Sequence, residues 1–251
     1  MANNPQLVAE ERSGIGVLSD PSARERGLLV AFTDRRGGVS GSPYAELNLA
    51  ARVGDDVDAV MENRQRAADV IGYEPERLAL SRQVHGRDLI DVETEQTGVI
   101  GEADGLLVSS PGPVVGILTA DCAPVVVEGD GRAAVLHGGW RGLVAGVLAA
   151  GVDAIGGAQR AWIGPCIKSC CYEVGAEVLA AFDESGLPVA QRDSNGGRVD
   201  IADAARASLE KAGVTDVVDS GICTHCNHNY YSFRRDGVTG RQGAIVSILE
   251  A

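Results

Sequence analysis

Residues 114–155, VVGILTADCAPVVVEGDGRAAVLHGGWRGLVAGVLAAGVDAI, carry the pattern that decides the fold class. Three short apolar runs follow one another at Val114–Leu118, Val125–Val127 and Ala133–Leu136, and Gly, Asp or Pro separates them. Short apolar runs between turn residues are typical of buried strands. The next segment, Leu143–Ile155, is rich in Ala and Val and predicts a helix. This stretch therefore indicates a sheet that packs against helices.

The same signals continue on both sides of this stretch. Leu28–Thr33 predicts a strand, and Asp56–Ile71 predicts a helix because its apolar residues recur at helical spacing. Further strands and helices are predicted at Leu78–Leu80, Leu89–Val92, Leu106–Val108, Val174–Phe182 (helix), Asp200–Ala212 (helix), Val217–Val218 and Ala244–Leu249. Strands and helices mix without strict alternation, which favours an α+β layered domain. We expect a single domain over residues 26–251 and a loose N-terminal arm over residues 1–25.

The composition narrows the class of protein. Hydrophobic residues make up 45% and charged residues 23% of 251 residues, which excludes a disordered or fibrous chain. The net charge of −13 makes nucleic acid and anionic membranes poor partners. The N-terminus has no signal-peptide pattern, and no apolar stretch approaches the roughly 18 residues of a membrane span. We therefore predict a cytoplasmic protein, in which six cysteines are thiols rather than a disulfide framework.

Three potential metal ligands stand at the ends of predicted strands. His85 lies in SRQVHGRD, Cys122 in TADCAP and His137 in AVLHGGWRG, each close to a small residue. Imidazole and thiolate ligands together suit zinc, and three ligands leave the fourth position open, as in catalytic sites. The spacing is not that of a compact zinc finger, so buried residues without a metal are the alternative interpretation.

The same side chains support a second chemistry. Cys122 could be the nucleophile of a Cys-His hydrolase. His85 or His137 would then be its base, and Asp121 would orient that base. A zinc ion on the thiolate would suppress this reactivity, so the two interpretations exclude each other at any one moment.

The segment HGGWRGLVAGVLAA predicts a strand that ends at His137 and a helix that begins near Arg141 or Gly142. Free backbone N–H groups at a helix N-terminus attract anions, and the Arg141 guanidinium adds further donors. The segment is therefore a candidate phosphate or carboxylate site. The alternative is a tight turn with Trp140 in the core and Arg141 in a salt bridge.

Two other stretches are rich in arginine and glycine. RRGGVSG around Arg36 and SFRRDG around Arg235 are candidate loops for an anionic or sugar group. Ordinary surface loops are the alternative, and Asp236-Gly237 by itself predicts a hairpin turn.

The remaining cysteines give a weaker signal. Cys223 and Cys226 form a CxxC with His225 and His228 interleaved, which leaves open a second metal or a redox pair. No second CxxC and no thioredoxin-like pattern accompany it, so we interpret these residues as unpaired thiols. Three further cysteines are interpreted as structural: Cys166, Cys170 and Cys171.

Eight short motifs occur together in a fixed order: RRGGVSGSPYAELNL, VGDDVDAVMENRQR, QVHG, ADGLLV, TADCAPV, LHGGWRGL, GPCI…CYEV and CT…YYSFRRDGVTGRQGA. With this combination the chain resembles the YfiH or laccase-domain family, also called multicopper polyphenol oxidoreductase domain proteins or YfiH-like purine nucleoside phosphorylases. The resemblance extends from Leu28 to the C-terminus.

The resemblance implies an α-β-β-α sandwich similar to bacterial deamidating toxins of the cysteine-hydrolase type. It implies one zinc per chain, held by His85, Cys122 and His137, with copper as a possible substitute in a purified sample. The implied reaction is phosphorolysis of adenosine, inosine or methylthioadenosine to the base and (methylthio)ribose 1-phosphate, with deamination of adenosine as a second activity. The implied partners are therefore purine nucleosides and phosphate, and no obligate protein partner is evident.

These reactions need particular side chains. Phosphorolysis needs cations near the sugar and a group for a ribose hydroxyl, and the candidates are Arg36, Arg141, Arg235 and, for the hydroxyl, Asn48. Deamination needs a carboxylate that moves a proton, and the candidates are Asp121 beside Cys122, then Asp104, Glu102 and Glu173.

Two other functions remain open at this level. Copper-dependent polyphenol oxidation needs several coppers and many histidines, and four histidines cannot supply the usual set. A non-catalytic accessory role in cell-wall (peptidoglycan) editing would tolerate changes at His85, Cys122 and His137.

Overall fold

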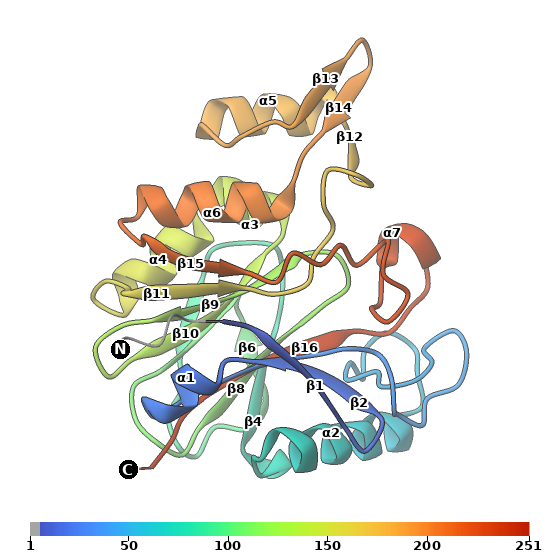
Figure 1. The fold of residues 1–251 in the computed structure, drawn as a ribbon, viewed down its shortest axis with the longest axis vertical. Helices are drawn as coiled ribbons and strands as arrows, with labels where there is room; N and C mark the ends of the chain where they lie inside the picture. The colour runs from blue at the N-terminus through green and yellow to red at the C-terminus, as the bar shows by residue number, and fades with distance from the viewer. Residues whose placement is uncertain (1–5, 251) are drawn as a thin grey trace.

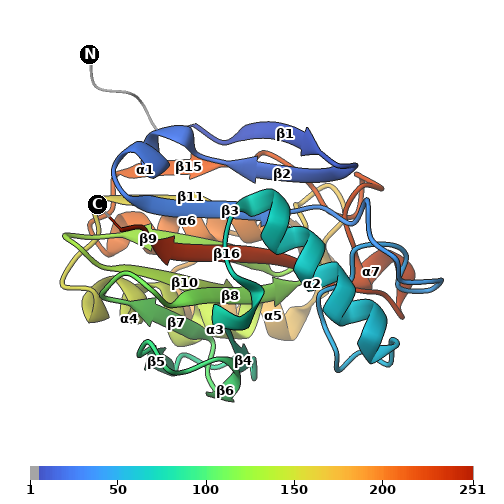
Figure 2. The same ribbon diagram turned by 90° about the horizontal axis from the view of Figure 1, so that it is seen from below.

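The computed structural model describes residues 6–250 and contains two large sheets that pack face to face (Figures 1 and 2). The seven-stranded sheet has the order β1 (Val8–Arg12), β2 (Ile15–Ser19), β3 (Leu28–Thr33), β16 (Gln242–Ile248), β8 (Val114–Thr119), β4 (Leu78–Arg82) and β6 (Gly98–Glu102). The six-stranded sheet has the order β15 (Asp216–Asp219), β11 (Arg160–Ile163), β9 (Ala123–Glu128), β10 (Ala133–Gly138), β7 (Gly105–Val108) and β5 (Leu89–Asp91). A small third sheet consists of β12 (Glu173–Gly175), β14 (Gly196–Arg198) and β13 (Gln191–Asp193).

Helices cover the outer faces of the two large sheets. The helix α2 (Val57–Ile71) packs on the seven-stranded sheet, as Figure 2 shows. The outer face of the six-stranded sheet carries α3 (Trp140–Ala145), α4 (Val147–Ala154), α6 (Ile201–Lys211) and, beside the small sheet, α5 (Ala176–Ser185). Three short helices complete the set: α1 (Pro21–Glu25), η1 (Pro75–Arg77) and α7 (Phe233–Asp236). The layers are therefore helix, sheet, sheet and helix, in agreement with the predicted sandwich; the relationship to deamidating toxins stays a prediction.

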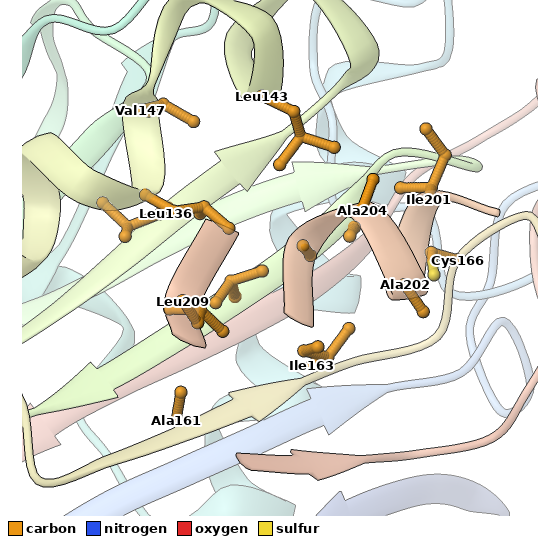
Figure 3. Close-up of a cluster of buried hydrophobic side chains, with 14 of the residues drawn as sticks. Leu136, Leu143, Val147, Ala161, Ile163, Cys166, Ile201, Ala202, Ala204 and Leu209 are labelled. Atoms are coloured by element: carbon orange, nitrogen blue, oxygen red, sulfur yellow. The ribbon is translucent and has the colours of Figure 1, made fainter. Parts of the chain in front are cut away.

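The core explains how a chain with few aromatic residues packs closely. One buried cluster lies between the two sheets and includes Val115, Val135 and Trp162. Another lies between the six-stranded sheet and its helices, where Leu136 faces Val147 (Figure 3). Gly151 lets α4 approach this sheet, because a Cβ at Gly151 would lie 2.4 Å from a methyl group of Leu136.

Local sequence signals account for most helix ends. The Asp56 side chain caps α2, which ends at Gly72 in the left-handed region, and Asp200 caps α6 in the same way. These two predicted helices are confirmed. The helix predicted over Leu143–Ile155 is instead two helices, because Gly146, with φ of 84°, ends α3 and precedes α4.

We expected a loose arm over residues 1–25, but from Val8 onward this segment forms two strands and a short helix. Residues 1–5 lie outside the described part of the chain. The pair β1 and β2 extends the seven-stranded sheet, and Ile15 is buried in its core. The sequence of β1, VAEER, has no alternating pattern because four of its five residues are exposed. The predicted hairpin turn at Asp236-Gly237 is also wrong, since these residues end the helix α7. Within residues 6–250, no helix combines the length and apolar character needed to cross a bilayer.

Candidate active site

Three strand ends bring His85, Cys122 and His137 together. His85 follows β4 and Cys122 follows β8, and these strands are parallel neighbours, so their carboxyl ends lie side by side. His137 lies near the end of β10 in the facing sheet. One donor atom from each side chain lies within 4.8 Å of the other two. The Cys122 Sγ is 3.9 Å from the His85 Nε2, and the centroids of the two imidazole rings are 4.7 Å apart.

The backbone around these residues is strained at two positions, and such strain is typical of functional sites. His85 and Asp121 are not glycines, yet their φ angles are 61° and 96°. Residues in this region cost free energy and persist where the surroundings require them. Gly139 is limited by space rather than by its backbone angles, because a Cβ there would lie 2.9 Å from His85 Cδ2 and 3.1 Å from Cys122 Sγ. Only a residue without a side chain lets the three donors converge.

Asp104 is the buried carboxylate that orients two of the donors. It accepts a hydrogen bond from His137 Nδ1 at 2.7 Å, so the other ring nitrogen of His137 is free for the site. It also accepts from the backbone N–H groups of Val84, His85 and Gly86, at 3.2, 2.9 and 2.6 Å. A carboxylate behind a histidine in this way is the usual support of a metal-binding imidazole. Among the candidate carboxylates, Asp104 is thus placed as a positioning residue.

The electrostatics of the three groups depend on one another. Burial opposes ionisation of the Cys122 thiol, but the imidazoles of His137 and His85 outweigh it and lower its pKa to about 6. Burial also disfavours the charged form of His137, but Cys122 and Asp104 outweigh this effect and raise its pKa to about 9. A thiolate beside two imidazoles is a donor set that suits zinc or another borderline divalent cation.

Asp121 connects the Cys122 loop to two other segments. Its Oδ1 accepts from the Thr224 hydroxyl at 2.7 Å, and its Oδ2 accepts from the Arg234 backbone N–H at 2.7 Å. Its carbonyl oxygen accepts from the Ile167 N–H at 2.8 Å. Both carboxylate oxygens are therefore engaged by donors that hold the loop in place.

A cavity of about 540 Å³ opens beside the three donors. We call it the cavity. Its lining includes two half-buried arginines, Arg64 of α2 and Arg241 just before β16. Arg64 donates to the Leu49 carbonyl at 3.0 and 2.8 Å, and Arg241 donates to the carbonyls of Thr239 and Gly240 at 2.8 and 2.9 Å. Burial lowers the pKa of both guanidinium groups. Over residues 6–250 neither pairs with a carboxylate, so both are available to an anion in the cavity.

Two residues predicted to bind anions, Arg36 and Arg141, do not line the cavity. Arg36 pairs with Asp34 and Glu11 and lines a separate, smaller pocket. Arg141 is exposed, and its guanidinium lies over the Trp140 ring at 4.2 Å from the centroid.

Arg235 and Asn48 hold loops around the cavity. The Arg235 guanidinium donates to the carbonyls of Thr224, His225 and Tyr230. Asn48 is buried, and its amide oxygen accepts from the Arg241 backbone N–H at 2.9 Å. Asn48 therefore contributes through the position of Arg241.

Sequence reasoning did not assign Arg64 to the site, although a signal existed. Arg64 falls on the buried face of α2, four residues after Val60 and three before Ala67, both of which are buried. A charged residue on the apolar face of a helix is unusual and indicates that its side chain has a functional role. Arg241 lies outside the helices and strands, and its only signal was its place in the arginine- and glycine-rich stretch SFRRDGVTGRQ.

The comparisons with known proteins agree with the predicted family. The profile of the family described as multi-copper polyphenol oxidoreductase laccase matches residues 29–249. The chain belongs to this family.

Its laccase-family relatives include "Purine nucleoside phosphorylase SCO2081" of Streptomyces coelicolor, which is 39% identical over 231 residues, 88% of this chain and 95% of that protein. "Purine nucleoside phosphorylase YfiH" of Escherichia coli is 35% identical over 89% of this chain and 95% of its own length. The crystal structure of YlmD from Geobacillus stearothermophilus matches with a TM-score of 0.88 and 29% identity, covering 98% of this chain and 100% of that chain.

Proposed function

We propose that this protein is a zinc-dependent purine nucleoside phosphorylase that converts adenosine, inosine or methylthioadenosine to the base and (methylthio)ribose 1-phosphate. One observation carries the proposal: a cavity of about 540 Å³ is lined by three metal-type donors and by two half-buried guanidinium groups without a carboxylate partner among the described residues. The volume is in the range of small-molecule sites. The names of the relatives from Streptomyces and Escherichia support the same reaction.

The donor set supports zinc as the metal. His85, Cys122 and His137 supply two imidazoles and one thiolate, and this number of ligands leaves one position of a tetrahedral ion open to a reactant. When bound, zinc would supply Lewis acidity at this wall of the cavity. Copper binds such donors more tightly, so the metal is to be identified by direct measurement.

The residues of the chain then have separate tasks. Arg64 and Arg241 bind phosphate through charge-assisted hydrogen bonds. Phosphate oxygen forms a bond to C1′ of the ribose while the glycosidic bond breaks, and the base leaves with the electron pair and takes up a proton. Phe233, 57% exposed at the cavity, offers a ring face for the base. Asp104 keeps His137 in one orientation throughout.

Deamination of adenosine is part of the same proposal. It replaces the 6-amino group of the base by the oxygen of water and releases ammonia. This reaction does not need phosphate, so the products distinguish it from phosphorolysis.

A second candidate function rests on the low pKa of the Cys122 thiol. The Cys122 Sγ lies within 4.8 Å of a ring nitrogen of His137, and the His137 Nδ1 donates to Asp104, so that a thiol, an imidazole and a carboxylate are close together as in a Cys-His hydrolase. Such an enzyme would keep its activity after metal removal, whereas the proposed phosphorylase would lose it.

The test combines metal analysis with product analysis. The purified chain is expected to contain zinc and to release adenine from adenosine only when phosphate is present, with inosine as the product of deamination. Arg64→Gln and Arg241→Gln should each raise the KM for phosphate by roughly tenfold or more, since each removes charge-assisted hydrogen bonds. Arg66→Gln is the matched control, because Arg66 lies on the same helix and pairs with Glu62 at 2.8 Å. Adenine formation without phosphate, or unchanged turnover after chelation, would refute the proposal.

A further inference from the structure

Four cysteine side chains from two segments far apart in the sequence lie together. We call Cys170, Cys171, Cys223 and Cys226 the tetrathiol cluster. Their four Sγ atoms all lie within 4.8 Å of one another. The Cys226 Sγ is 3.2 Å from that of Cys171 and 3.6 Å from that of Cys170. Neither His225 nor His228 belongs to this group of described side chains.

We propose that the tetrathiol cluster is a second metal site, a closed structural site for one zinc ion. Four thiolates around a tetrahedral zinc, with Zn–S bonds of about 2.3 Å, place the sulfur atoms roughly 3.8 Å apart. The sulfur atoms here are already grouped on that scale. Four sulfur ligands select zinc over hard cations such as magnesium and calcium and leave no position for a substrate. The site is therefore distinct in chemistry from the open trio of His85, Cys122 and His137.

The backbone around Cys223 gives an independent argument. The backbone N–H groups of Lys168, His225 and Cys226 lie close to the Cys223 sulfur. A tight turn produces this geometry, because the Asn227 N–H donates to the Cys223 carbonyl at 3.0 Å. Backbone N–H groups close to a cysteine sulfur are typical of metal-bound cysteine.

The two segments are also joined by their backbones. The Cys166 N–H donates to the Ile222 carbonyl at 3.3 Å, and the Thr224 N–H donates to the Cys166 carbonyl at 3.1 Å. The Thr224 hydroxyl in turn holds Asp121, the residue before Cys122. A metal in the tetrathiol cluster would therefore stabilise the segment that positions Cys122, one of the three metal-type donors beside the cavity.

The proposal is tested on the full chain under reducing conditions, with zinc as the probe. His85→Ala reduces the competing trio to two ligands. After loading with zinc and gel filtration, this variant is expected to hold one zinc per chain. The double variant His85→Ala/Cys226→Ala is expected to hold none, whereas His85→Ala/Cys166→Ala keeps its zinc. Cys166 is the matched control because it is a buried thiol of the same segment outside the cluster.

A second measurement needs no substitution. Zinc-loaded and chelator-treated wild-type protein are alkylated, and the modified cysteines are located by mass spectrometry. We expect Cys170, Cys171, Cys223 and Cys226 to be protected together and to react together after chelation. The proposal is overturned if His85→Ala holds no zinc, if the Cys226→Ala double variant retains it, or if two cluster cysteines form a disulfide in the native protein.

Discussion

Replacing Asp104 by Asn should weaken both the fold and the metal site, because this buried side chain receives four hydrogen bonds. One oxygen accepts from His137 Nδ1 and the His85 N–H, and the other accepts from the N–H groups of Gly86 and Val84. Asn keeps the shape but has only one oxygen. Its amide group donates, so it faces one pair of N–H groups that then have no acceptor.

The magnitude follows from these contacts. A hydrogen bond to a charged group contributes about 1.5–3 kcal/mol, and the Val84 contact at 3.2 Å is the weakest of the four. The loss of two bonds predicts a decrease of about 3–6 kcal/mol in the free energy of unfolding. Because His137 loses the negative charge of its orienting partner whichever way the amide faces, zinc affinity should fall by about 10- to 100-fold.

Two assays separate these effects. Urea unfolding of the metal-free protein gives the stability, and titration against a competing chelator gives the zinc affinity. Asp130→Asn is the matched control, since Asp130 is exposed in the turn after β9. Zinc affinity in Asp104→Asn within twofold of the wild-type value would refute the orienting role, whatever the change in stability.

Three other perturbations have defined outcomes. Gly139→Ala should lose turnover and the zinc held by His85, Cys122 and His137, because its Cβ would lie 2.9 Å from His85 Cδ2; Gly41→Ala, where no atom lies within 4 Å, should leave both unchanged, and equal zinc content in the two variants would contradict this. Gly151→Ala should lower the free energy of unfolding by about 1–3 kcal/mol through overpacking against Leu136. Turnover should persist at temperatures where this variant is folded, and an unchanged urea midpoint would show that the helix can shift at no cost. Raising the pH above about 10 should destabilise the protein, because burial raises the pKa of several tyrosines (that of Tyr172 to about 12), so the unfolded chain releases protons that the folded chain retains. Urea midpoints at pH 9 and pH 11 test this, and full tyrosinate absorbance before unfolding would contradict it.

The elements with strong periodicity or caps were predictable from the sequence. The strand β3 was predicted with its observed bounds, and α2 and α6 correspond to the predicted helices over Asp56–Ile71 and Asp200–Ala212. The strand β1 was not predictable, because edge position leaves its residues exposed and removes the apolar pattern. The helix break at Gly146 was also missed, since Ala and Val on both sides favour a continuous helix.

Some residues of the site could also be predicted from the sequence, and others could not. His85, Cys122 and His137 could be chosen from the sequence because few residue types bind zinc and each stands at a strand end. The sequence could not show which of the arginines predicted to bind anions line the cavity, because hydrogen bonds between segments of the chain decide the direction of each side chain. Arg235 donates to carbonyls 5 to 11 residues away in the chain, and Arg36 pairs with Asp34 and Glu11. The tetrathiol cluster was missed because six helices and strands, from β12 to β15, separate Cys170 and Cys171 from Cys223 and Cys226 in the sequence.

The strand β16 occupies the middle of the seven-stranded sheet, where Ala244 pairs with Phe32 on one side and with Ile117 on the other. During synthesis on the ribosome, β3 and β8 therefore cannot pair with β16 until residues 242–248 have been made. Until then both strands present unpaired edges, which are templates for association with other chains. Contacts between segments this far apart also predict slow folding. Cells that produce the protein should therefore need chaperone protection late in its translation, and a chain shortened before Gln242 should aggregate rather than fold.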